Sequence, residues 1–391
     1  MQTDDLRLVL RSHMPQLDAL RGFAILWVIL HNVSFDGIGP AQGPIMAAIY
    51  LLGNTGWIGV QLFFVLSGFL ITGILLDGRG TTHHFRNFYA RRTLRIFPLY
   101  YGFLLLVFVI LPWTGLVSWL DSTPVERFWY WSYLTNWGMV FEKHVTFPHL
   151  WSLAIEEQYY LLWPLLAFVL SKRTLAYICL ALIVSAPLCR AYLMFHFDVN
   201  FSTDAMYTFT VARWDALAIG SLLALSVRSE RAFTYIQRYL PRVFVLLSVL
   251  LLAQIGVMRN FSATHYQGIV NQTTIALWFA MLILISIVSW RNPLDRIRPV
   301  FSNGFLRWIG KYSYAIYIFH FPAKMFWYHY FGTAEIPNAP WRQVGVVLYN
   351  FIGISGIATV VAYVSWHVLE HPFLKLKRYF VVVRKPAITP N

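Results

Sequence analysis

Long apolar runs dominate the chain and alternate with shorter polar connections. Each run has the length needed to cross a hydrocarbon core of about 30 Å, which takes roughly 20 helical residues. Because a segment within the bilayer must pair its backbone polar groups internally, each run is predicted to be an α-helix. The sequence therefore predicts an all-α integral membrane protein of about ten transmembrane helices, at residues 17–35, 57–76, 96–113, 150–170, 174–193, 207–227, 243–258, 269–290, 308–331 and 344–366.

The first apolar run contains polar residues that its apolar character does not require. A cation inside a membrane helix is costly unless it faces protein or water, so such residues mark a functional path. On an α-helix Asn32 lies roughly 20° round from Arg21 and about 16.5 Å along, while His31 is rotated by roughly 80°. We expect Asn32 to share the face of Arg21. In the structural alternative, Arg21 extends to the membrane surface and His31 is hydrogen-bonded inside the helix bundle.

Basic residues are placed unevenly along this chain, which is 58% hydrophobic, 12% charged and has a formal net charge of +14. Soluble proteins have about 25% charged residues. Of the 31 Lys and Arg, 22 lie before the first run, after the last one, or in loops that follow even-numbered runs, and five, including Arg190, are assigned to the opposite loops. Positive loops are cytoplasmic, so both termini are predicted to be cytoplasmic. The same bias accounts for most of the basic charge without a nucleic-acid partner.

The chain is predicted to form a single membrane domain over residues 1–391. Its spans cover about residues 17–366, a cytoplasmic basic tail follows at 367–391, and we expect no appended soluble domain and no cleaved signal peptide. The two cysteines, Cys179 and Cys189, lie in one apolar run, so neither a disulfide framework nor a metal site is indicated.

Two clusters of charged residues at helix ends suggest chemistry. Arg92 and Arg95 are three residues apart and share one face of a helix, and guanidinium groups bind phosphate bidentately. The alternative is a basic cluster that contacts anionic membrane lipid. Glu156 lies near the predicted outer end of the fourth run, where an acidic side chain needs a partner. An ion pair with Arg213 is the structural alternative there.

The predicted depths of the polar residues form a pattern. Five lie in the middle or outer part of their runs, whereas the two arginines lie at the cytoplasmic rim. This arrangement suits a phosphate-bearing donor that is held on the inside and reaches an acid/base group in the membrane. The five residues are His31, Asn32, Glu156, Asp215 and His320.

Several motifs together resemble the membrane-bound acyltransferase 3 family, in family order and over nearly the whole chain. They are Leu-Asp-Ala-Leu-Arg-Gly at 17–22, Phe-Phe-Val-Leu-Ser-Gly-Phe-Leu-Ile-Thr at 63–72, Arg-Arg-Thr-Leu-Arg-Ile-Phe-Pro at 91–98, Trp-Ser-Leu-Ala-Ile-Glu-Glu-Gln-Tyr-Tyr-Leu-Leu-Trp-Pro at 151–164, Arg-Trp-Asp-Ala-Leu at 213–217, Ser-Tyr-Ala-Ile-Tyr at 313–317 with His320, and Glu-His-Pro-Phe-Leu at 370–374.

The resemblance implies an O-acyltransferase of the plasma membrane, the inner membrane of a bacterium. Such an enzyme takes an acyl group, commonly acetyl, from cytoplasmic acyl-CoA. It passes the group to a hydroxyl of an extracytoplasmic or lipid-linked carbohydrate, with no metal required. Arg21, Arg92 and Arg95 are then the expected donor-binding residues, and the expected partners are acyl-CoA, a carbohydrate or glycolipid acceptor and membrane lipid.

One departure from the family pattern concerns the general base. The family spacing is an arginine, ten residues and a histidine, which places Asn32 where a histidine is expected, with His31 one residue earlier. In the first assignment His31 is the base, Glu156 orients it and Asn32 stabilises the oxyanion. In the second, Asn32 binds the acyl carbonyl or the acceptor, and His320 takes the proton.

Two rival functions belong to other classes. In a transporter the polar residues would form a proton or substrate path, but that class favours inverted repeats and broken helices, which the sequence does not show. A family member that binds a glycolipid without catalysis is the second rival.

Overall fold

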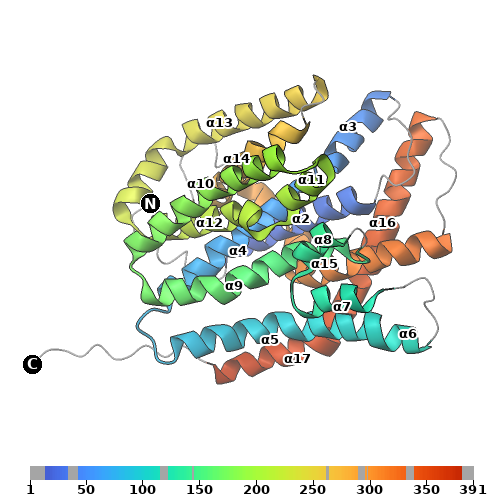
Figure 1. Cartoon of the computed structure of the whole chain (residues 1–391), viewed down its shortest axis with the longest axis horizontal. Helices are drawn as coiled ribbons and strands as arrows, with labels where there is room; N and C mark the ends of the chain where they lie inside the picture. The colour runs from blue at the N-terminus through green and yellow to red at the C-terminus, as the bar shows by residue number, and fades with distance from the viewer. Residues whose placement is uncertain are drawn as a thin grey trace, which may run out of the picture. The chain divides into compact units, whose positions relative to one another are not determined.

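The computed structural model describes residues 14–33, 43–114, 122–142, 145–260, 264–288, 296, 298–331 and 339–380. Over these residues the regular elements are all helices, which confirms the predicted fold class (Figure 1). Residues 1–13 and 381–391, which contain part of the predicted cytoplasmic ends, lie outside the described residues.

Each of the ten predicted runs is largely helical over its described residues, although the run at 207–227 contains a break at Phe209, where the backbone is extended. Seven helices in the described parts of the chain are long and apolar enough to cross a membrane, so the protein is polytopic. The other three runs correspond to helices outside these seven. These are α2 (Pro15–Val33), α9 (Trp151–Val169) and α15 (Gly304–Phe331).

The chain forms two compact units. Unit 1 comprises Met1–Leu66, Glu230–Val257 and Thr274–Val364. It contains α2, α3 (Gly43–Asn54), the start of α4 (Ile58–Asp77), most of α13 (Glu230–Asn260) and of α14 (Thr264–Ile287), η4 (Arg298–Ser302), α15 and nearly all of α16 (Pro340–Ser365).

Unit 2 comprises Ser67–Ser229, Met258–Thr273 and Ser365–Asn391. Besides the rest of α4 and all of α9, it contains α5 (His84–Leu105), η1 (Leu106–Ile110), α6 (Leu111–Thr114), α7 (Pro124–Trp131), α8 (Thr135–Phe141), η2 (Pro148–Leu150), α10 (Lys172–His196), α11 (Val199–Thr208), α12 (Thr210–Ser226), η5 (Trp366–Glu370), α17 (His371–Lys375) and η6 (Leu376–Tyr379).

Glycines bring α2 and α15 into backbone contact within unit 1. A Cβ on Gly22 would overlap the carbonyl group of Leu306, and a Cβ on Gly310 would overlap that of Asp18. The approach is therefore reciprocal, with one glycine from each helix. Without a hydrophobic force between helices in lipid, such close van der Waals contact drives their association.

A second face of α2 packs on the chain around the start of α4. A Cβ on Gly56 would overlap the carbonyl oxygen of Trp27, and a Cβ on Gly59 would overlap that of Ala24. Helix α2 is thus held on two sides within unit 1, and residues near its C-terminus are directed to one side or the other.

In unit 2 a run of hydroxyl groups connects α4, α9 and α12. The Thr72 hydroxyl donates to Ser221 Oγ at 2.8 Å, and Trp163 Nε1 donates to Thr72 Oγ1 at 2.8 Å. The hydroxyls of Tyr159 and Ser221 are 2.5 Å apart. Interhelical hydrogen bonds of this kind hold helices together in lipid, where a polar group needs a protein partner.

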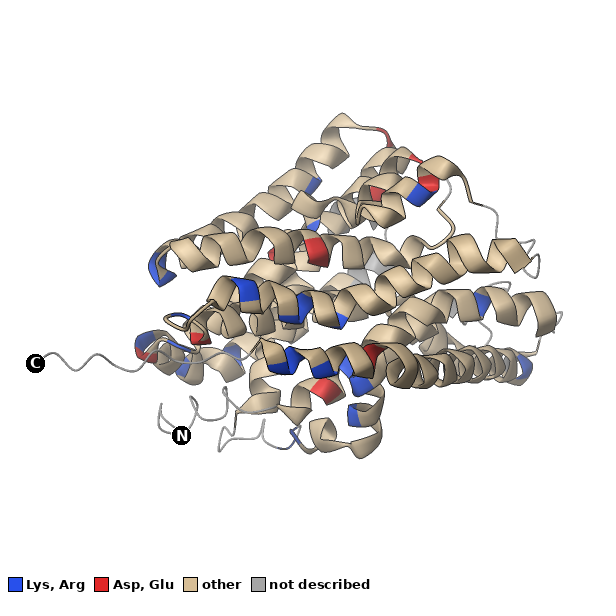
Figure 2. Ribbon diagram, turned by 90° about the horizontal axis from the view of Figure 1, so that it is seen from below, with Lys and Arg blue, Asp and Glu red and all other residues tan. Residues whose placement is uncertain are grey.

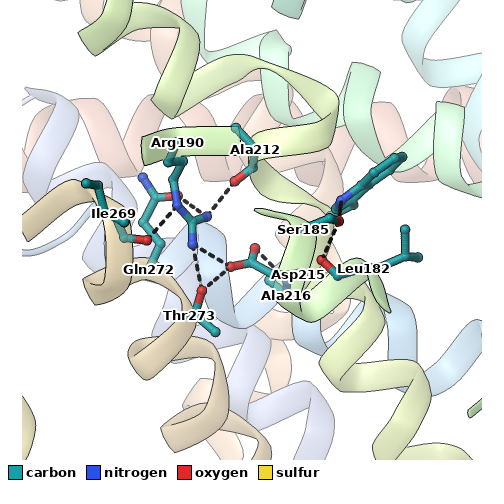
Figure 3. Close-up of polar contacts among 10 residues, drawn as sticks. Leu182, Ser185, Arg190, Ala212, Asp215, Ala216, Ile269, Gln272 and Thr273 are labelled. Carbon is teal, nitrogen blue, oxygen red and sulfur yellow. Dashed lines mark hydrogen bonds and ion pairs between the residues drawn. The ribbon is translucent and has the colours of Figure 1, made fainter. Parts of the chain in front are cut away.

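Arg190 lies within the predicted run at 174–193, and its counting among the loop cations is wrong because it is fully buried in α10. Its Nη2 forms an ion pair with Asp215 Oδ2 at 3.0 Å and donates to Thr273 Oγ1 at 2.6 Å (Figure 3). Its other N–H groups donate to Ile269 O, Ala212 O and Gln272 Oε1. All five donors of the guanidinium are used, which is what a buried arginine requires.

The same network changes the interpretation of Asp215. Its Oδ2 also accepts the Thr273 hydroxyl at 2.5 Å, and its Oδ1 accepts the backbone N–H of Ala216 at 2.9 Å (Figure 3). Asp215, predicted to belong to the mid-membrane polar set, is thus bound in an ion pair between α10 and α12. The loops opposite the basic side lose one of their five cations, which strengthens the charge bias.

Candidate active site

The predicted site residues divide between the two units. Unit 1 contains Arg21, His31, Asn32 and His320, and unit 2 contains Arg92, Arg95 and Glu156.

A hydrogen bond joins Asn32 at the end of α2 to His320 on α15. Asn32 Nδ2 lies 3.0 Å from His320 Nε2, and His320 Nδ1 lies 2.6 Å from the carbonyl oxygen of Tyr317. A carbonyl oxygen only accepts, so Nδ1 carries the proton of the neutral ring and Nε2 carries the lone pair. The Asn32 amide group therefore donates to Nε2. His320 is fully buried and has a basic nitrogen that is already oriented.

His31 points to a different part of unit 1. Its Nδ1 lies 2.9 Å from the carbonyl oxygen of Gly53 at the end of α3, and its Cβ lies against Gly56. The donor to Gly53 must be Nδ1–H, so the lone pair of the neutral ring is again on Nε2. Helix α2 is regular through both residues, and the 100° step per residue sends His31 and Asn32 to different neighbours.

Arg21 lies near the N-terminus of α2 and is paired locally. Its Nη1 is 3.2 Å from Asp18 Oδ1, one turn earlier, and both side chains are partly exposed. Along the helix axis it is about 16.5 Å from Asn32, so these two residues do not form one contact site.

In unit 2 the Glu156 carboxylate is held by two hydroxyl groups. Ser67 Oγ of α4 donates to Oε1 at 2.9 Å, and Tyr160, one turn later on α9, donates to Oε2 at 2.9 Å. The guanidinium of Arg92 on α5 lies 3.7 Å from the centroid of the Tyr160 ring, a cation–π contact. Glu156 and Arg92 are thus connected through a single tyrosine.

Arg213, the alternative partner for Glu156, lies between aromatic rings. Its guanidinium carbon is 5.2 Å from the ring centroid of Trp151 and 5.0 Å from that of Tyr207, and the side chain is fully buried. Aromatic faces stabilise a desolvated guanidinium through their quadrupoles.

Helix α5 carries the predicted pair of arginines, Arg92 and Arg95, and helices α17 and η6 pack against it. Both residues lie inside this helix, which begins at His84, twelve residues before the predicted run at 96–113. The C-terminal helices α17 and η6 contact α5, as Figure 1 shows for α17. Lys377 of η6 lies within electrostatic range of Arg91, Arg92 and Arg95.

The basic cluster therefore consists of Arg91, Arg92, Arg95 and Lys377, with the carboxylate of Glu370 in electrostatic range of Arg95. Figure 2 colours basic residues blue and acidic residues red. The carboxylate of Glu157 is likewise in electrostatic range of Arg92. Cations that lie this close together favour the binding of an anion. Lys377 and Glu370 were not predicted as site residues. In the sequence, Glu370 begins the Glu-His-Pro-Phe-Leu motif at 370–374, and Lys377 belongs to the basic stretch after the last span.

A comparison with known families decides the identity. The family model described as an acyltransferase domain matches residues 14–366. The chain belongs to the acyltransferase 3 family. This confirms the resemblance drawn from the motifs, and the match ends before Glu370 and Lys377.

Curated relatives of this acyltransferase 3 member are O-acetyltransferases by name. A putative peptidoglycan O-acetyltransferase of Bacillus subtilis is 28% identical over 384 residues, covering 92% of this chain and 55% of that protein. A peptidoglycan O-acetyltransferase of Listeria monocytogenes is 27% identical over 403 residues, covering 96% of this chain and 60% of that protein. A putative O-acetyltransferase of Staphylococcus aureus is 28% identical, covering 93% and 58%.

The chain thus spans a little more than half the length of these curated relatives. No solved structure matches the chain. Among the side chains that the structure describes, no group of three or more His, Cys, Asp and Glu could hold a metal ion.

Proposed function

We propose that this acyltransferase 3 member is an integral membrane O-acetyltransferase that moves an acetyl group from acetyl-CoA to a hydroxyl of a cell-envelope carbohydrate. Peptidoglycan is the first acceptor to test, because relatives from Bacillus and Listeria carry that name. The observation that carries the proposal is the buried His320 with its basic Nε2 held by Asn32. Neutral histidine is the most common general base for such a transfer.

In this proposal His320 removes the proton of the acceptor hydroxyl. The acceptor takes the place of the Asn32 amide at Nε2, and the oxygen attacks the thioester carbonyl. The displaced Asn32 N–H donates to the oxyanion that develops, as oxyanion-stabilising donors do. The tetrahedral intermediate then collapses with cleavage of the C–S bond, and the proton held by His320 passes to the leaving thiolate, which departs as CoA thiol. The Asn32–His320 contact favours the second of the two sequence assignments, and His31 is then the alternative base.

The basic cluster of unit 2 is the proposed site for the phosphates of the donor. Arg92 and Arg95 bind them as forks, and Lys377 adds a point charge. In the first assignment, where His31 is the base, Glu156 is the proposed orienting carboxylate, and two hydroxyl donors hold its oxygens. Arg21, with its local pair, is the proposed donor contact on unit 1.

We place the single membrane domain over residues 1–391 in the plasma membrane, with both termini in the cytoplasm and the basic cluster on that side. The proposed partners are acetyl-CoA, a carbohydrate or glycolipid acceptor and membrane lipid, and no metal takes part.

The decisive experiment offers radiolabelled acetyl-CoA and purified peptidoglycan to the purified protein in liposomes. The expected result is label on the glycan with the parent protein and none with the double variant Asn32→Ala, His320→Ala. Movement of a solute without transfer indicates a transporter. Glycan binding without transfer indicates the non-catalytic family member, and either result overturns the proposal.

The donor site has its own test. Arg92→Ala, Arg95→Ala and Lys377→Met should each raise KM for acetyl-CoA more than KM for the acceptor. A lost charge-assisted hydrogen bond costs about 1.5–3 kcal/mol, roughly 10- to 150-fold in binding. Arg86→Ala is the matched control, because Arg86 is an exposed arginine of the same helix. An unchanged acetyl-CoA KM in all three variants would remove this site.

A further inference from the structure

Lys324 is a cation on α15 that contacts the candidate site from one turn beyond His320. Its Nζ donates to the backbone carbonyl of Asn32 at 2.8 Å. The ammonium also lies 5.3 Å from the ring centroid of Phe321 and 5.9 Å from that of Tyr328. The side chain is half-buried, and a lysine at such a position in a membrane helix has a functional reason by default.

The carbonyl of Asn32 lies in the last described turn of α2 (Pro15–Val33), where the Lys324 ammonium donates to it. In lipid a backbone polar group needs a protein partner, and a charged donor forms a stronger hydrogen bond than a neutral one.

Asn32 is therefore fixed by two residues one turn apart on α15. His320 holds the Asn32 side chain, and Lys324 holds its backbone carbonyl. The ammonium also lies within electrostatic range of both His31 and His320. Lys324 thus contacts the same residue of α2 that binds His320.

We infer that Lys324 is a positioning residue for acetyl transfer, which holds Asn32 in register with His320. The inference rests on the proposed function for its effect on turnover. It extends that function, because neither the motifs nor the family comparison singles out this lysine.

The first test compares Lys324→Met and Lys324→Arg with a matched control. Lys324→Met should lower kcat by about 10²-fold, the cost of a misplacement of about 1 Å at an active site, and leave KM for acetyl-CoA unchanged. Lys324→Arg keeps a donor and a charge and should recover part of the loss. Lys311→Met, the same change at an exposed position on the same helix, should stay near the parent. Equal kcat in Lys324→Met and Lys311→Met overturns the inference.

The second test separates positioning from simple stability. If Lys324 acts through Asn32, then Lys324→Met should reduce kcat only slightly further in an Asn32→Ala background, while its effect on the melting temperature persists. Two kcat losses that multiply contradict the inference, because independent residues behave additively in free energy.

A readout without turnover keeps the inference testable if the parent transfers no acetyl group. With ¹⁵N-labelled histidine and a His320→Gln spectrum for assignment, the Nε2 resonance of His320 reports the hydrogen bond from Asn32. Lys324→Met should shift this resonance, and Lys311→Met should not. An unmoved resonance overturns the positioning role, whereas a moved one in an inactive parent supports it and rejects only the proposed function.

Discussion

At the scale of single residues, the two assignments of the general base predict opposite effects of substituting His31 and His320. His31 bonds to Gly53 and His320 bonds to Asn32, so they belong to different contacts of unit 1. We expect His320→Ala to lower kcat for acetyl transfer by about 10²- to 10⁴-fold, the usual contribution of general acid–base catalysis. His31→Ala should stay within a few-fold of the parent. His329→Ala, an exposed histidine of α15, is the control for His320.

The reverse outcome restores the first assignment. If His31→Ala loses turnover and His320→Ala does not, then His31 is the base. The double change His31→Leu, Asn32→His should in that case recover part of the activity, because it returns a histidine to the family spacing.

The buried ion pair of Arg190 and Asp215 predicts a large effect on stability. Asp215→Asn leaves a guanidinium without its counter-charge inside unit 2, and the loss of one partner of a buried pair costs about 3–5 kcal/mol. Denaturant unfolding in detergent measures this cost. Asp77→Asn is the matched control, because Asp77 is 40% exposed in its pair with Arg228 and such pairs contribute about 0–1 kcal/mol. Equal costs for the two variants would contradict a structural role specific to the buried pair.

Sequence reasoning found candidate site residues but not their partners. Glu156 and His320 stood out because a polar residue in an apolar run is costly without a purpose, and Arg92 stood out because it shares a helix face with Arg95. Ser67, which contacts Glu156, and Lys324, which contacts Asn32, lie on other helices than the residues they contact. Helical periodicity describes only the face of one helix. Arg190 was placed in a loop because its position near the end of a run gave no sign of Thr273 and Asp215.

At the scale of helices, the apolar runs located the spans well and their ends poorly. Helix α5 begins at His84 and α13 at Glu230, each more than ten residues before the predicted run. These extensions carry arginines whose charge lowers the hydropathy, although arginine has a good helix propensity. A run of apolar residues thus marks the part of a helix in lipid and not the whole helix.

The reciprocal glycine contact predicts how α2 and α15 keep their register. Gly310→Ala places a Cβ against the Asp18 carbonyl, so the helices must separate, and overpacking of this kind costs about 1–3 kcal/mol. Because the same two helices carry Asn32 and His320, kcat should fall together with the melting temperature. Gly345→Ala on α16 meets no atom within 4 Å and should be neutral or stabilising by up to about 1 kcal/mol. A Gly310→Ala protein with parental kcat would show that turnover does not depend on the register of α2 and α15.

At the scale of the whole molecule, the charge bias predicts an orientation that the helices alone leave open. Moving Arg190 from a loop into α10 leaves four predicted cations on one side against 22 on the other. Such an asymmetry sets the orientation of a polytopic protein because basic loops are retained in the cytoplasm. Thr203 lies before α12 (Thr210–Ser226) and Ser229 lies after it, and both residues are exposed, so they can report on the two sides of the membrane.

The orientation can be measured by labelling single cysteines with a membrane-impermeant maleimide. In a Cys179→Ser, Cys189→Ser background, Thr203→Cys should react in intact cells, and Ser229→Cys should react only after the cells are permeabilised. Ser171→Cys, in the exposed connection between α9 and α10, should behave like Ser229→Cys because an even number of predicted spans separates the two positions. The opposite labelling would place the basic cluster of α5 and η6 outside the cell, away from cytoplasmic acetyl-CoA, and would remove the donor site together with the orientation.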